Sequence, residues 1–263
     1  MTGQAVRVIE NNEYFFQHYQ SLTPRHVVNC RLRLIPGEEH LLIDLLHRGI
    51  QLIPSASSQI TSRSKVHQAR IFSDFMLPNT VAVYDTNSLL EATSLFTSQA
   101  IGDVVVKRDR KNSGIGIHRF SNIEDVYNQA SFGRLEFPFV IQPLAQGFRD
   151  IRLISLGDYT EAYERKNSGN FRHNLHCGGS AEPVEVTQKL REFGSKVMER
   201  GGFPYAHIDV MLFDRELNGK RFYLTEINLR GGLRGARISA PDYQLQIKSI
   251  HDRLVLEHLK SNS

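Results

Sequence analysis

The chain has 263 residues, of which 40% are hydrophobic and 23% are charged, an ordinary composition for a globular protein that can bury a core of its own. No apolar run approaches the roughly 18–20 residues that a membrane span needs, and the N-terminal stretch lacks the basic-then-apolar pattern of a signal peptide. Cys30 and Cys177 are too few for a disulfide framework, so we expect a cytoplasmic protein. The net charge of +4 is small and dispersed, which favours an anionic small-molecule ligand over a nucleic acid or a membrane.

Helices and one short strand are predicted in the first hundred residues. Residues 38–49 have the apolar spacing of an amphipathic helix that Gly49 ends, and a short strand follows from Ile50. Further helices are predicted over 62–75, after which the chain reaches a proline that cannot continue a helix, and over 88–100. A helix followed by a strand indicates an α/β unit at the front of the chain.

From residue 103 onward, strands joined by tight turns dominate. Gly157-Asp158 fits a type II′ turn, and Asn218-Gly219 is the strongest hairpin signal in the chain. The predicted strands cover 103–107, 115–120, 137–144, 150–156, 159–165, 205–214 and 221–229, and the predicted helices cover 187–202 and 241–259. Because helices and antiparallel hairpins are mixed, we predict an α+β fold class.

The last predicted strand ends in two polar residues. Because side chains alternate across a strand, this prediction places Glu226 and Asn228 on the same face as Phe222 and Leu224. A carboxylate is costly to bury unless another group pairs with it. The sequence therefore raises the question of what pairs with Glu226.

A hairpin centred on Asn218-Gly219 places Asp209 directly opposite Asn228, with Glu226 one step along the same face. Two carboxylates and an amide oxygen form a set of hard ligands that suits Mg²⁺, an ion that also binds phosphate oxygens. The alternative is that Asp209 and Glu226 only neutralise nearby arginines such as Arg230. The sequence leaves both interpretations open.

A glycine-containing loop follows the strand that ends in Lys107. Lys107 shares a face of this strand with Val105, and the loop contains Gly114 and Gly116, where glycine lets backbone N–H groups approach phosphates. The loop lies between two strands, so it is neither a Walker A loop nor a Rossmann fingerprint. A flap over a triphosphate is the nearer analogue, and an ordinary turn is the alternative.

Other segments carry groups that suit a nucleotide or an anion. The strand "FVIQPL" (139–144) ends in a hydrogen-bonding side chain and a proline, an edge that suits an adenine. Guanidinium groups bind carboxylates and phosphates, and several arginines lie in glycine-rich surroundings. The anion-binding candidates are Arg165, Arg172, Asn174, His176, Arg230, Arg234 and Arg237.

Two alternatives concern these same residues. The type II′ turn sets Asp150 across from Arg165, so a cross-strand ion pair also accounts for both. His173, His176 and Cys177 are close in sequence, but they lack a fourth ligand, which disfavours a zinc site.

In their order along the chain, these motifs resemble the ATP-grasp superfamily, and most closely the RimK-type ligases that join glutamate to carboxyl groups of proteins or small molecules. The resemblance covers about residues 40–258. It is most specific in "GNFRHNLHCGG" (169–179) and "TEIN" (225–228), which carry several matched residues in matched order.

The resemblance implies an ATP-grasp fold in which ATP lies between two α+β subdomains. We expect the smaller subdomain, with the glycine-rich flap, at 63–145 and the larger one, with the metal site, at 146–263. A truncated α/β segment at 1–62 precedes them, whereas the N-terminal domain of the family is fuller. Pro143 also departs from the family, which usually has an acidic residue at that place.

The resemblance further implies roles for individual residues. Those implied to bind ATP are Lys65, Lys107, Ser113, Gly114, Gly116, Gln142, Pro143, Leu144, Asp150, Arg172 and Asn174. Those implied to hold two Mg²⁺ ions, or Mn²⁺ in their place, are Asp209, Glu226 and Asn228. Those implied to be catalytic, near the transferred phosphoryl group or the acceptor carboxylate, are Arg152, Arg165, Arg172 and Arg230.

The reaction implied is that of an ATP-dependent carboxylate–amine ligase. A carboxylate of a small molecule or peptide becomes an acyl phosphate, an amine such as an amino acid attacks it, and ADP and phosphate are released. Relatives are often dimers or tetramers, so a homo-oligomer is expected. Two alternatives stay open, namely a small-molecule kinase with the same fold and a non-catalytic nucleotide-binding protein. The second is disfavoured because all three metal ligands are present.

Overall fold

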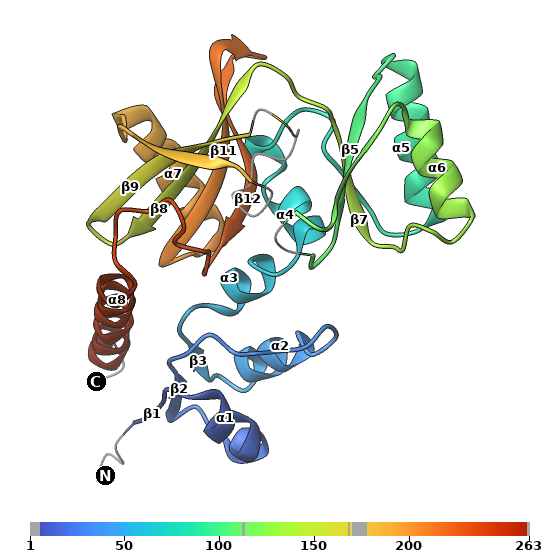
Figure 1. Cartoon of the computed structure of the whole chain (residues 1–263). Coiled ribbons are helices and arrows are strands. Elements are labelled where there is room, and N and C mark those ends of the chain that lie inside the picture. Colours follow the sequence, from blue (N-terminus) through green and yellow to red (C-terminus); the bar gives the residue numbers. More distant parts are fainter. Residues whose placement is uncertain (1–5, 112–113, 168, 170–177, 262–263) are drawn as a thin grey trace.

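The computed structural model describes residues 6–111, 114–167, 169 and 178–261 of the chain. Three β-sheets and the helices packed on them make up the described part (Figure 1). No helix within these ranges is long and apolar enough to cross a membrane.

The first sheet is small and parallel, with strand order β1-β2-β3. Its segment consists of β1 (Arg7–Ile9), α1 (Asn12–His18), η1 (Tyr19–Ser21), β2 (His26–Val28), α2 (His40–His47) and β3 (Gln51–Leu52). Phe15, Leu42 and Leu45 are fully buried in its core. The helix predicted at 38–49 and the strand that follows it are confirmed, and so is the α/β character of the front of the chain.

The second sheet is antiparallel, with strand order β4-β7-β5-β6. It contains β4 (Val81–Val83), α5 (Thr86–Ser98), β5 (Val104–Arg108), β6 (Ile117–Phe120), α6 (Ile123–Ser131) and β7 (Phe139–Pro143). Both helices lie on the face that points away from the third sheet (Figure 1), and Leu89, Phe96 and Val126 fill the core beneath them. The opposite face, which carries Val105 and Lys107, is free to line a ligand site.

The third sheet is antiparallel, with strand order β10-β9-β8-β11-β12. It contains β8 (Phe148–Leu156), β9 (Tyr159–Lys166), β10 (Ser180–Val184), β11 (Tyr205–Leu217) and β12 (Lys220–Asn228). The remaining helices are α3 (Ala56–Thr61), α4 (Lys65–Ile71), η2 (Ser73–Phe75), α7 (Gln188–Gly201) and α8 (Ala240–Ser261). α4 and α7 contribute Val66, Ala69, Leu190 and Val197 to the core of this sheet. Gly202 ends α7 in the left-handed conformation that glycine commonly adopts at the end of a helix.

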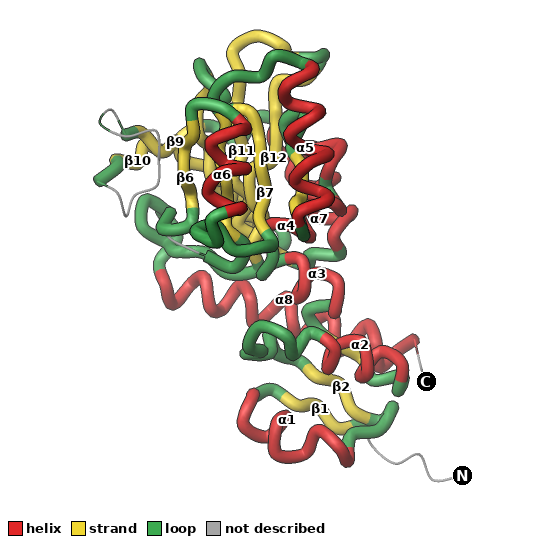
Figure 2. Tube along the Cα trace, turned by 90° about the vertical axis from the view of Figure 1, so that its right-hand side faces the viewer, coloured by secondary structure: helices red, strands yellow, loops and turns green. Residues whose placement is uncertain are grey.

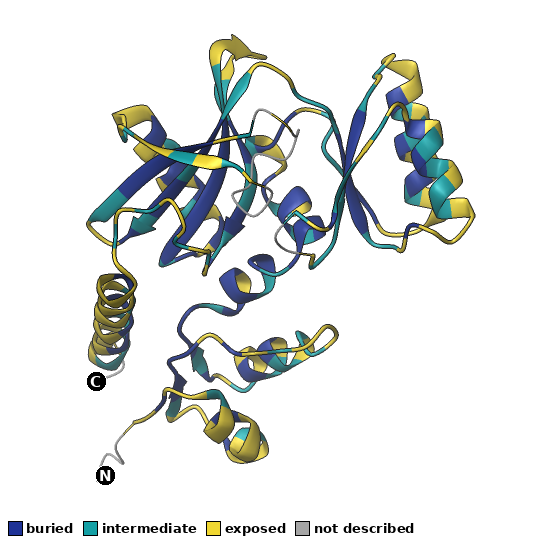
Figure 3. Ribbon diagram, viewed as in Figure 1, coloured by how far each residue is buried: buried dark blue, intermediate teal, exposed yellow. Residues whose placement is uncertain are grey.

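Figure 2 shows the N-terminal segment apart from the two larger sheets, with α3 and α8 between them. Buried residues concentrate in the strands of the two larger sheets, and the outer surfaces of α5, α6 and α8 are exposed (Figure 3). The division of the chain at residues 62 and 145 stays a prediction, because α4 contacts both larger sheets.

Several short elements were not predicted from the sequence. These are α1, α3, α6, β1, β2, β4 and β10. Four of them are strands of no more than five residues, namely β1, β2, β4 and β10. Strands of this length are too short to show a clear periodic pattern. The strand and helix predictions made for residues 103–120, 137–165 and 187–259 are confirmed to within a few residues.

Both predicted turns form. Gly157 has φ 61°, as the first position of a type II′ turn requires, and Asn218 and Gly219 have φ 50° and 73°, as a type I′ turn requires. Leu217 pairs with Lys220 across the second turn.

The register of the second hairpin nevertheless differs from the prediction. Asp209 pairs with Glu226, whereas Val210 pairs with Leu224, so Thr225 is an extra residue in β12. This is a β-bulge, which re-aims the side chains that follow it. A second irregularity lies nearer the turn, where Leu212 pairs with Phe222 and Leu217 with Lys220, so that β11 has three more residues than β12 there. Because of these two irregularities together, the prediction that Asp209 lies directly opposite Asn228 is wrong.

The bulge also overturns the predicted face of the two polar residues. Leu224 lies in the same core cluster as Ile227 and Leu229, although an uninterrupted alternation would separate them. Glu226 and Asn228 consequently point to the opposite face, where they line a cavity. Their exposure to that cavity, and not to the apolar core, answers the question of how Glu226 is accommodated.

Candidate functional site

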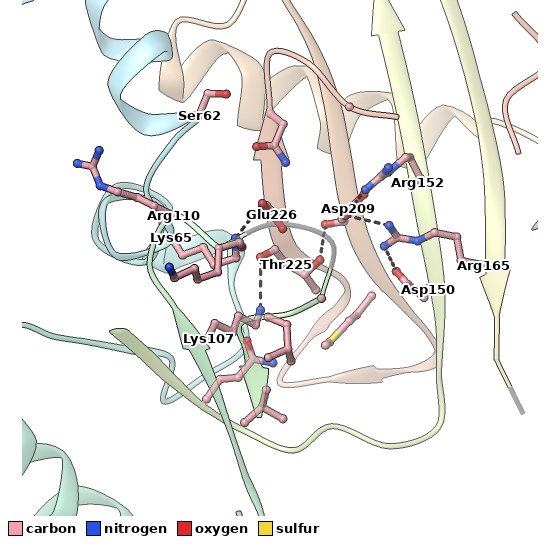
Figure 4. Close-up of a pocket in the computed structure, with 18 of the residues that line it drawn as sticks. Ser62, Lys65, Lys107, Arg110, Asp150, Arg152, Arg165, Asp209, Thr225 and Glu226 are labelled. Carbon is pink, nitrogen blue, oxygen red and sulfur yellow. Dashed lines mark hydrogen bonds and ion pairs between the residues drawn. The ribbon is translucent and has the colours of Figure 1, made fainter. Parts of the chain in front are cut away.

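A cavity of about 930 Å³ lies between the second and third sheets, and the N-terminal segment contributes to its wall (Figure 4). Strands of both sheets, the residues before α4 and the turn after β12 supply the lining. The structure brings together twelve of the seventeen residues to which the resemblance assigned a role: Lys65, Lys107, Gly114, Gln142, Leu144, Asp150, Arg152, Arg165, Asp209, Glu226, Asn228 and Arg230. Of the further anion-binding candidates, Arg234 also lines the cavity, whereas Arg237 does not and pairs with Glu161.

The other five of these seventeen residues are not part of this described wall. Gly116 and Pro143 do not line the cavity. Gly116 has a local structural role, since a Cβ atom there would lie 2.4 Å from the Cβ of Lys111. Ser113, Arg172 and Asn174 lie outside the described residues, as do His173, His176 and Cys177 of the disfavoured zinc interpretation.

Two lysines approach the cavity from different elements. Lys107 comes from β5, and its Nζ donates to the backbone oxygen of Thr225 at 3.4 Å. Burial lowers the pKa of Lys107 to about 8, although Glu226 opposes this shift. Lys65 begins α4, and its Nζ donates to the backbone oxygen of Lys111 at 2.9 Å and to Glu226 Oε1 at 3.1 Å. Both ammonium groups are therefore placed to meet an anion.

The N-cap of α4 fixes the position of Lys65. Ser64 Oγ accepts a hydrogen bond from the backbone N–H of His67 and donates to Asp109 Oδ1 at 3.0 Å. Asp109 belongs to the loop after β5, so this contact joins the helix to the glycine-containing loop. The first turn of α4 and that loop are held together beside the cavity.

Asp209 is a buried carboxylate held by two arginines. Arg152 donates to both of its oxygens at 2.6 and 2.7 Å, and Arg165 donates to Oδ2 at 3.1 Å. Burial alone would raise the pKa of Asp209, but these two guanidinium groups outweigh it and hold the pKa well below its usual range. Arg165 also donates to Asp150 at 2.7 Å, so the cross-strand ion pair considered from the sequence is present.

Arg230, which the sequence suggested as a partner of the two acids, is therefore not the arginine that neutralises Asp209. Arg152 and Arg165 pair with Asp209, and Lys65 pairs with Glu226. Arg230 pairs with neither of these two described acids, although it lines the same cavity.

The three proposed metal ligands fit a hard divalent cation in kind. Asp209 and Glu226 are direct partners across β11 and β12, and Asn228 follows on the same face as Glu226. No group of three acidic, histidine or cysteine side chains suited to a metal occurs within the described ranges, so an amide oxygen, waters and phosphate oxygens would complete the shell. Lys65 and the two arginines occupy the carboxylate oxygens and would have to yield some of these contacts.

Several cavity residues were missed in the sequence. Arg31, Leu34 and Pro36 come from the loop before α2, and Arg63 precedes α4. No periodic or glycine-rich pattern marks them, since their neighbours in the cavity are distant in sequence. Thr225 belongs to "TEIN", but only the bulge brings it to the wall.

A family model described as "RimK-like ATP-grasp domain" matches residues 97–249, more than half of the chain. The chain belongs to the RimK-like ATP-grasp family. The match spans most of the second sheet and the whole of the third, where the cavity's proposed metal ligands lie.

Individual relatives agree with this family assignment. A probable alpha-L-glutamate ligase of Pectobacterium carotovorum subsp. carotovorum (strain PC1) is 28% identical over 217 residues, which cover 70% of this chain and 69% of that protein. The matches to two further alpha-L-glutamate ligases cover only 28% of their length. The solved structure of the D-cycloserine synthetase DcsG superposes with a TM-score of 0.59 at 13% identity, over 87% of this chain and 84% of that one.

The ATP-grasp fold and the α+β class are therefore confirmed. The predicted enzyme class is confirmed as well, because the relatives of this family member are ATP-dependent ligases that form C–N bonds. The solved structure of the ATP-grasp ligase PsnB holds Mg and ADP, at a TM-score of 0.51 and 17% identity over 81% of this chain and 66% of that one. The predicted use of ATP agrees with these findings, whereas the predicted number of metal ions is not tested by them and stays a prediction.

Proposed function

We propose that this chain activates a carboxylate with ATP and joins it to an amine in the cavity between its second and third sheets. The observation that carries this proposal is the convergence of Lys65, Lys107 and Arg230 with Asp209 and Glu226 in one cavity (Figure 4). Lysine and arginine side chains bind phosphates and carboxylates, and the carboxylates of aspartate and glutamate bind a metal ion. The identities of the carboxylate and of the amine are not part of this proposal.

The nucleotide is assigned to the side formed by the second sheet. Lys107 and Gln142 come from adjacent strands β5 and β7, and Leu144 directly follows β7. Gln142 and Leu144 offer an amide and an apolar edge to a base, while the charged forms of Lys107 and Lys65 attract phosphates. Lys65 also binds the loop after β5, which keeps the glycine-containing loop close to that site.

Asp209, Glu226 and Asn228 are the residues that would hold Mg²⁺. When bound, the ion neutralises phosphate charge and fixes the triphosphate for in-line transfer. The chain's own contribution is to present oxygen ligands from two neighbouring strands and to keep Asp209 ionised, because Arg152 and Arg165 hold its pKa low.

The chemical steps need no protein nucleophile. An oxygen of the substrate carboxylate attacks the γ-phosphorus of ATP, the bond from that phosphorus to the bridging oxygen breaks, and ADP leaves. The lone pair of the amine then attacks the acyl carbon, phosphate leaves with the electron pair of the acyl–oxygen bond, and the amine releases a proton to solvent. The positive side chains of Arg152, Arg165 and Arg230 line the same cavity, and in this proposal they stabilise the negative charge that develops on phosphate and carboxylate oxygens.

The reaction class can be tested with the purified chain, ATP, Mg²⁺, and panels of carboxylates and amines. ADP release that requires both a carboxylate and an amine, with an amide detected by mass spectrometry, is the expected result. A stable phosphorylated product without an amide would instead identify a small-molecule kinase. ADP release that never depends on a carboxylate would contradict ligation.

Glu226→Ala is expected to lower turnover by about a hundredfold or more, the usual scale when a group that stabilises a transition state is lost. The reason is that Glu226 is one of the proposed metal ligands and also holds Lys65 at 3.1 Å. Turnover is measured at increasing Mg²⁺, together with the thermal unfolding midpoint to show that the fold is intact.

The matched control is Glu216→Ala, which removes an exposed glutamate of the same hairpin that does not line the cavity. This variant should keep wild-type turnover. Unchanged turnover in Glu226→Ala would refute the metal assignment.

A further inference from the structure

The cavity wall is strongly positive. Among the described residues, eleven cationic but only three acidic side chains line it. Each of the three acids already has a cationic partner, because Asp150 and Asp209 pair with arginines and Glu226 pairs with Lys65. A triphosphate together with its divalent ions is close to neutral, so it leaves much of this charge uncompensated.

Three arginines of this wall converge from segments that are far apart in the sequence. The backbone N–H of Leu229 donates to Ser62 Oγ at 2.9 Å, and the residues that follow these two, Arg230 and Arg63, both line the cavity. The charge of Arg230 also acts on Arg31. Arg63 Nη2 in turn donates to the backbone oxygen of Leu32, which follows Arg31. Arg31, Arg63 and Arg230 therefore form one cluster, the N-terminal arginine cluster.

A buried glutamine fixes the loop that carries Arg31. The backbone N–H of Leu32 donates to Gln59 Oε1 at 2.9 Å, and Gln59 Nε2 donates to the backbone oxygen of Pro54 at 2.8 Å. Gln59 is 1% exposed and Leu32 is fully buried. The backbone that carries Arg31 is thus fixed by the protein interior, while the side chains of Arg31 and Arg230 are exposed.

Within the part of the chain that the structure describes, Arg31, Arg63 and Arg230 form no ion pair with an acid, although Glu39, which pairs with Arg110, attracts Arg63. The side chains of Arg31 and Arg230 are exposed at the cavity, and Nη1 of Arg63 is buried without a hydrogen-bond partner. An unsatisfied buried donor is costly, and like charges placed together repel each other. Burial, followed by repulsion from Arg31, lowers the pKa of Arg63 to about 10.

The cluster lies away from the nucleotide side. Figure 4 shows Ser62 and Lys107 on opposite sides of Glu226, and Ser62 directly precedes Arg63 in the chain. With the triphosphate on the Lys107 side, as proposed, an anion held by the cluster would belong to the organic substrate and not to ATP.

We propose that the N-terminal arginine cluster is a second anion subsite, which binds a carboxylate or phosphate group that the carboxylate substrate carries in addition to the carboxylate that is activated. This inference rests on the proposed function for one point only, namely that the group activated by ATP is a carboxylate. It assigns a role to the short N-terminal segment, since Arg31 is the part of the site that this segment supplies. The substrate class is accordingly a dianion, either a dicarboxylate or a phosphorylated carboxylate.

The test measures binding, so that it does not depend on turnover. The full chain is saturated with a non-hydrolysable ATP analogue and Mg²⁺ and titrated calorimetrically with dicarboxylates from malonate to adipate, with monocarboxylates of equal chain length, and with 4-phosphonobutyrate. We expect at least one dianion to bind about tenfold or more tightly than its matched monocarboxylate, the scale of a desolvated charge pair. Preference for glutarate or for 4-phosphonobutyrate identifies the second group, and either preference supports the subsite.

Variants test whether the arginines of the cluster cause the preference for a dianion. Arg31→Gln should remove the preference for the dianion and leave monocarboxylate affinity unchanged. Arg63→Lys is the second variant, because it keeps a positive charge but loses the guanidinium fork. The matched control is Arg33→Gln, which removes an exposed arginine of the same loop that does not line the cavity.

Two results would overturn the subsite: no dianion binds more tightly than its monocarboxylate, or Arg33→Gln reduces the preference as much as Arg31→Gln. Carboxylate-dependent ADP release without any dianion preference would leave the proposed function standing and remove only the subsite. Dianion preference without ADP release would support the subsite and contradict ligation.

Discussion

Lys107 shows how one buried side chain can make the cavity sensitive to pH. Among the described residues, its ammonium group donates to the backbone oxygen of Thr225 and forms no salt bridge. Burial is the largest cause of its lowered pKa of about 8, because the surroundings disfavour the charged form. A phosphate that binds beside Lys107 favours the charged form instead.

The affinity for ATP is therefore expected to weaken as pH rises through about 8. In the free protein Lys107 is mostly charged at pH 7 and mostly neutral at pH 9, so the dissociation constant of ATP should rise about tenfold over this interval if only the charged form binds well. The measurement is the dissociation constant of a fluorescent ATP analogue between pH 7 and 9.

Lys107→Arg should flatten this profile, because a guanidinium group stays protonated throughout the range. Lys189→Arg is the control, since Lys189 is an exposed lysine of α7 that does not line the cavity, and it should keep the wild-type profile. An equally steep profile in Lys107→Arg would show that another group titrates.

At the scale of elements, α4 substitutes for a missing neighbour of the edge strand β12. Gln68 Nε2 donates to the backbone oxygen of Ile227 at 2.9 Å, and Gln68 Oε1 accepts from the backbone N–H of Ile227 at 3.0 Å. β12 is the last strand of its sheet, so these backbone groups have no further strand to bond with. Ile227 separates Glu226 from Asn228, and the amide of Gln68 thus fixes the stretch that carries both.

Gln68→Met should lower the free energy of unfolding by about 2–4 kcal/mol, because it leaves the buried N–H and C=O groups of Ile227 without partners. Methionine keeps a similar length, so the loss reports the hydrogen bonds more than the volume. The free energy is measured by urea unfolding, with turnover measured on the folded variant.

Gln188→Met is the matched control, because Gln188 is exposed on α7 and bonds only with Glu192 one turn away. It should change the stability by less than about 0.5 kcal/mol. Equal stability of the Gln68 and Gln188 variants would show that water satisfies the edge of β12.

The same hairpin shows what a sequence can and cannot predict. The turn at Asn218-Gly219 was predictable because a positive φ at both positions is a local property of the residue types. The pairing of Asp209 with Glu226 was not, because it depends on two irregularities, the bulge at Thr225 and the one between Leu212 and Leu217, which leave no mark on the apolar pattern. The acids of the candidate site were therefore named correctly as cavity residues, but from a wrong register.

The N-terminal arginine cluster lay beyond sequence reasoning for a related reason. Arg31 and Arg63 meet only because Arg63 bonds to the backbone of Leu32, a contact between segments about thirty residues apart. Motifs record residues that act within one segment, such as the lysine and glycines after β5. Contacts between segments appear only when the fold is known.

At the scale of the whole molecule, the N-terminal segment is joined to the third sheet through a buried histidine of α8. His251 Nδ1 faces Asn29 Oδ1 at 2.9 Å, and His251 Nε2 faces the hydroxyl of Tyr205 at 2.9 Å. Asn29 follows β2 and Tyr205 begins β11, so this chain of polar contacts links two parts of the fold through a helix. Val255 of the same helix packs on Val27 and Ile53. The arginine of the N-terminal loop depends on this connection for its place at the cavity.

Burial lowers the pKa of His251 below its ordinary value, so the folded protein keeps this imidazole neutral where the unfolded chain protonates it. The contribution of neutral His251 to stability is complete above the unfolded pKa of about 6.5 and is lost as pH falls from there toward the folded pKa, with a slope of at most about 1.4 kcal/mol per pH unit for one proton. We expect the free energy of unfolding to fall between pH 7 and 5. His251→Gln should show a shallower fall because it cannot take up the proton, whereas His47→Gln, which changes an exposed histidine of α2, should follow the wild type. Urea unfolding at intervals of half a pH unit gives the free energy of unfolding of the wild type and of both variants. If the free energy falls equally with pH in the wild type and in His251→Gln, His251 is not the group whose protonation weakens the connection to the N-terminal segment.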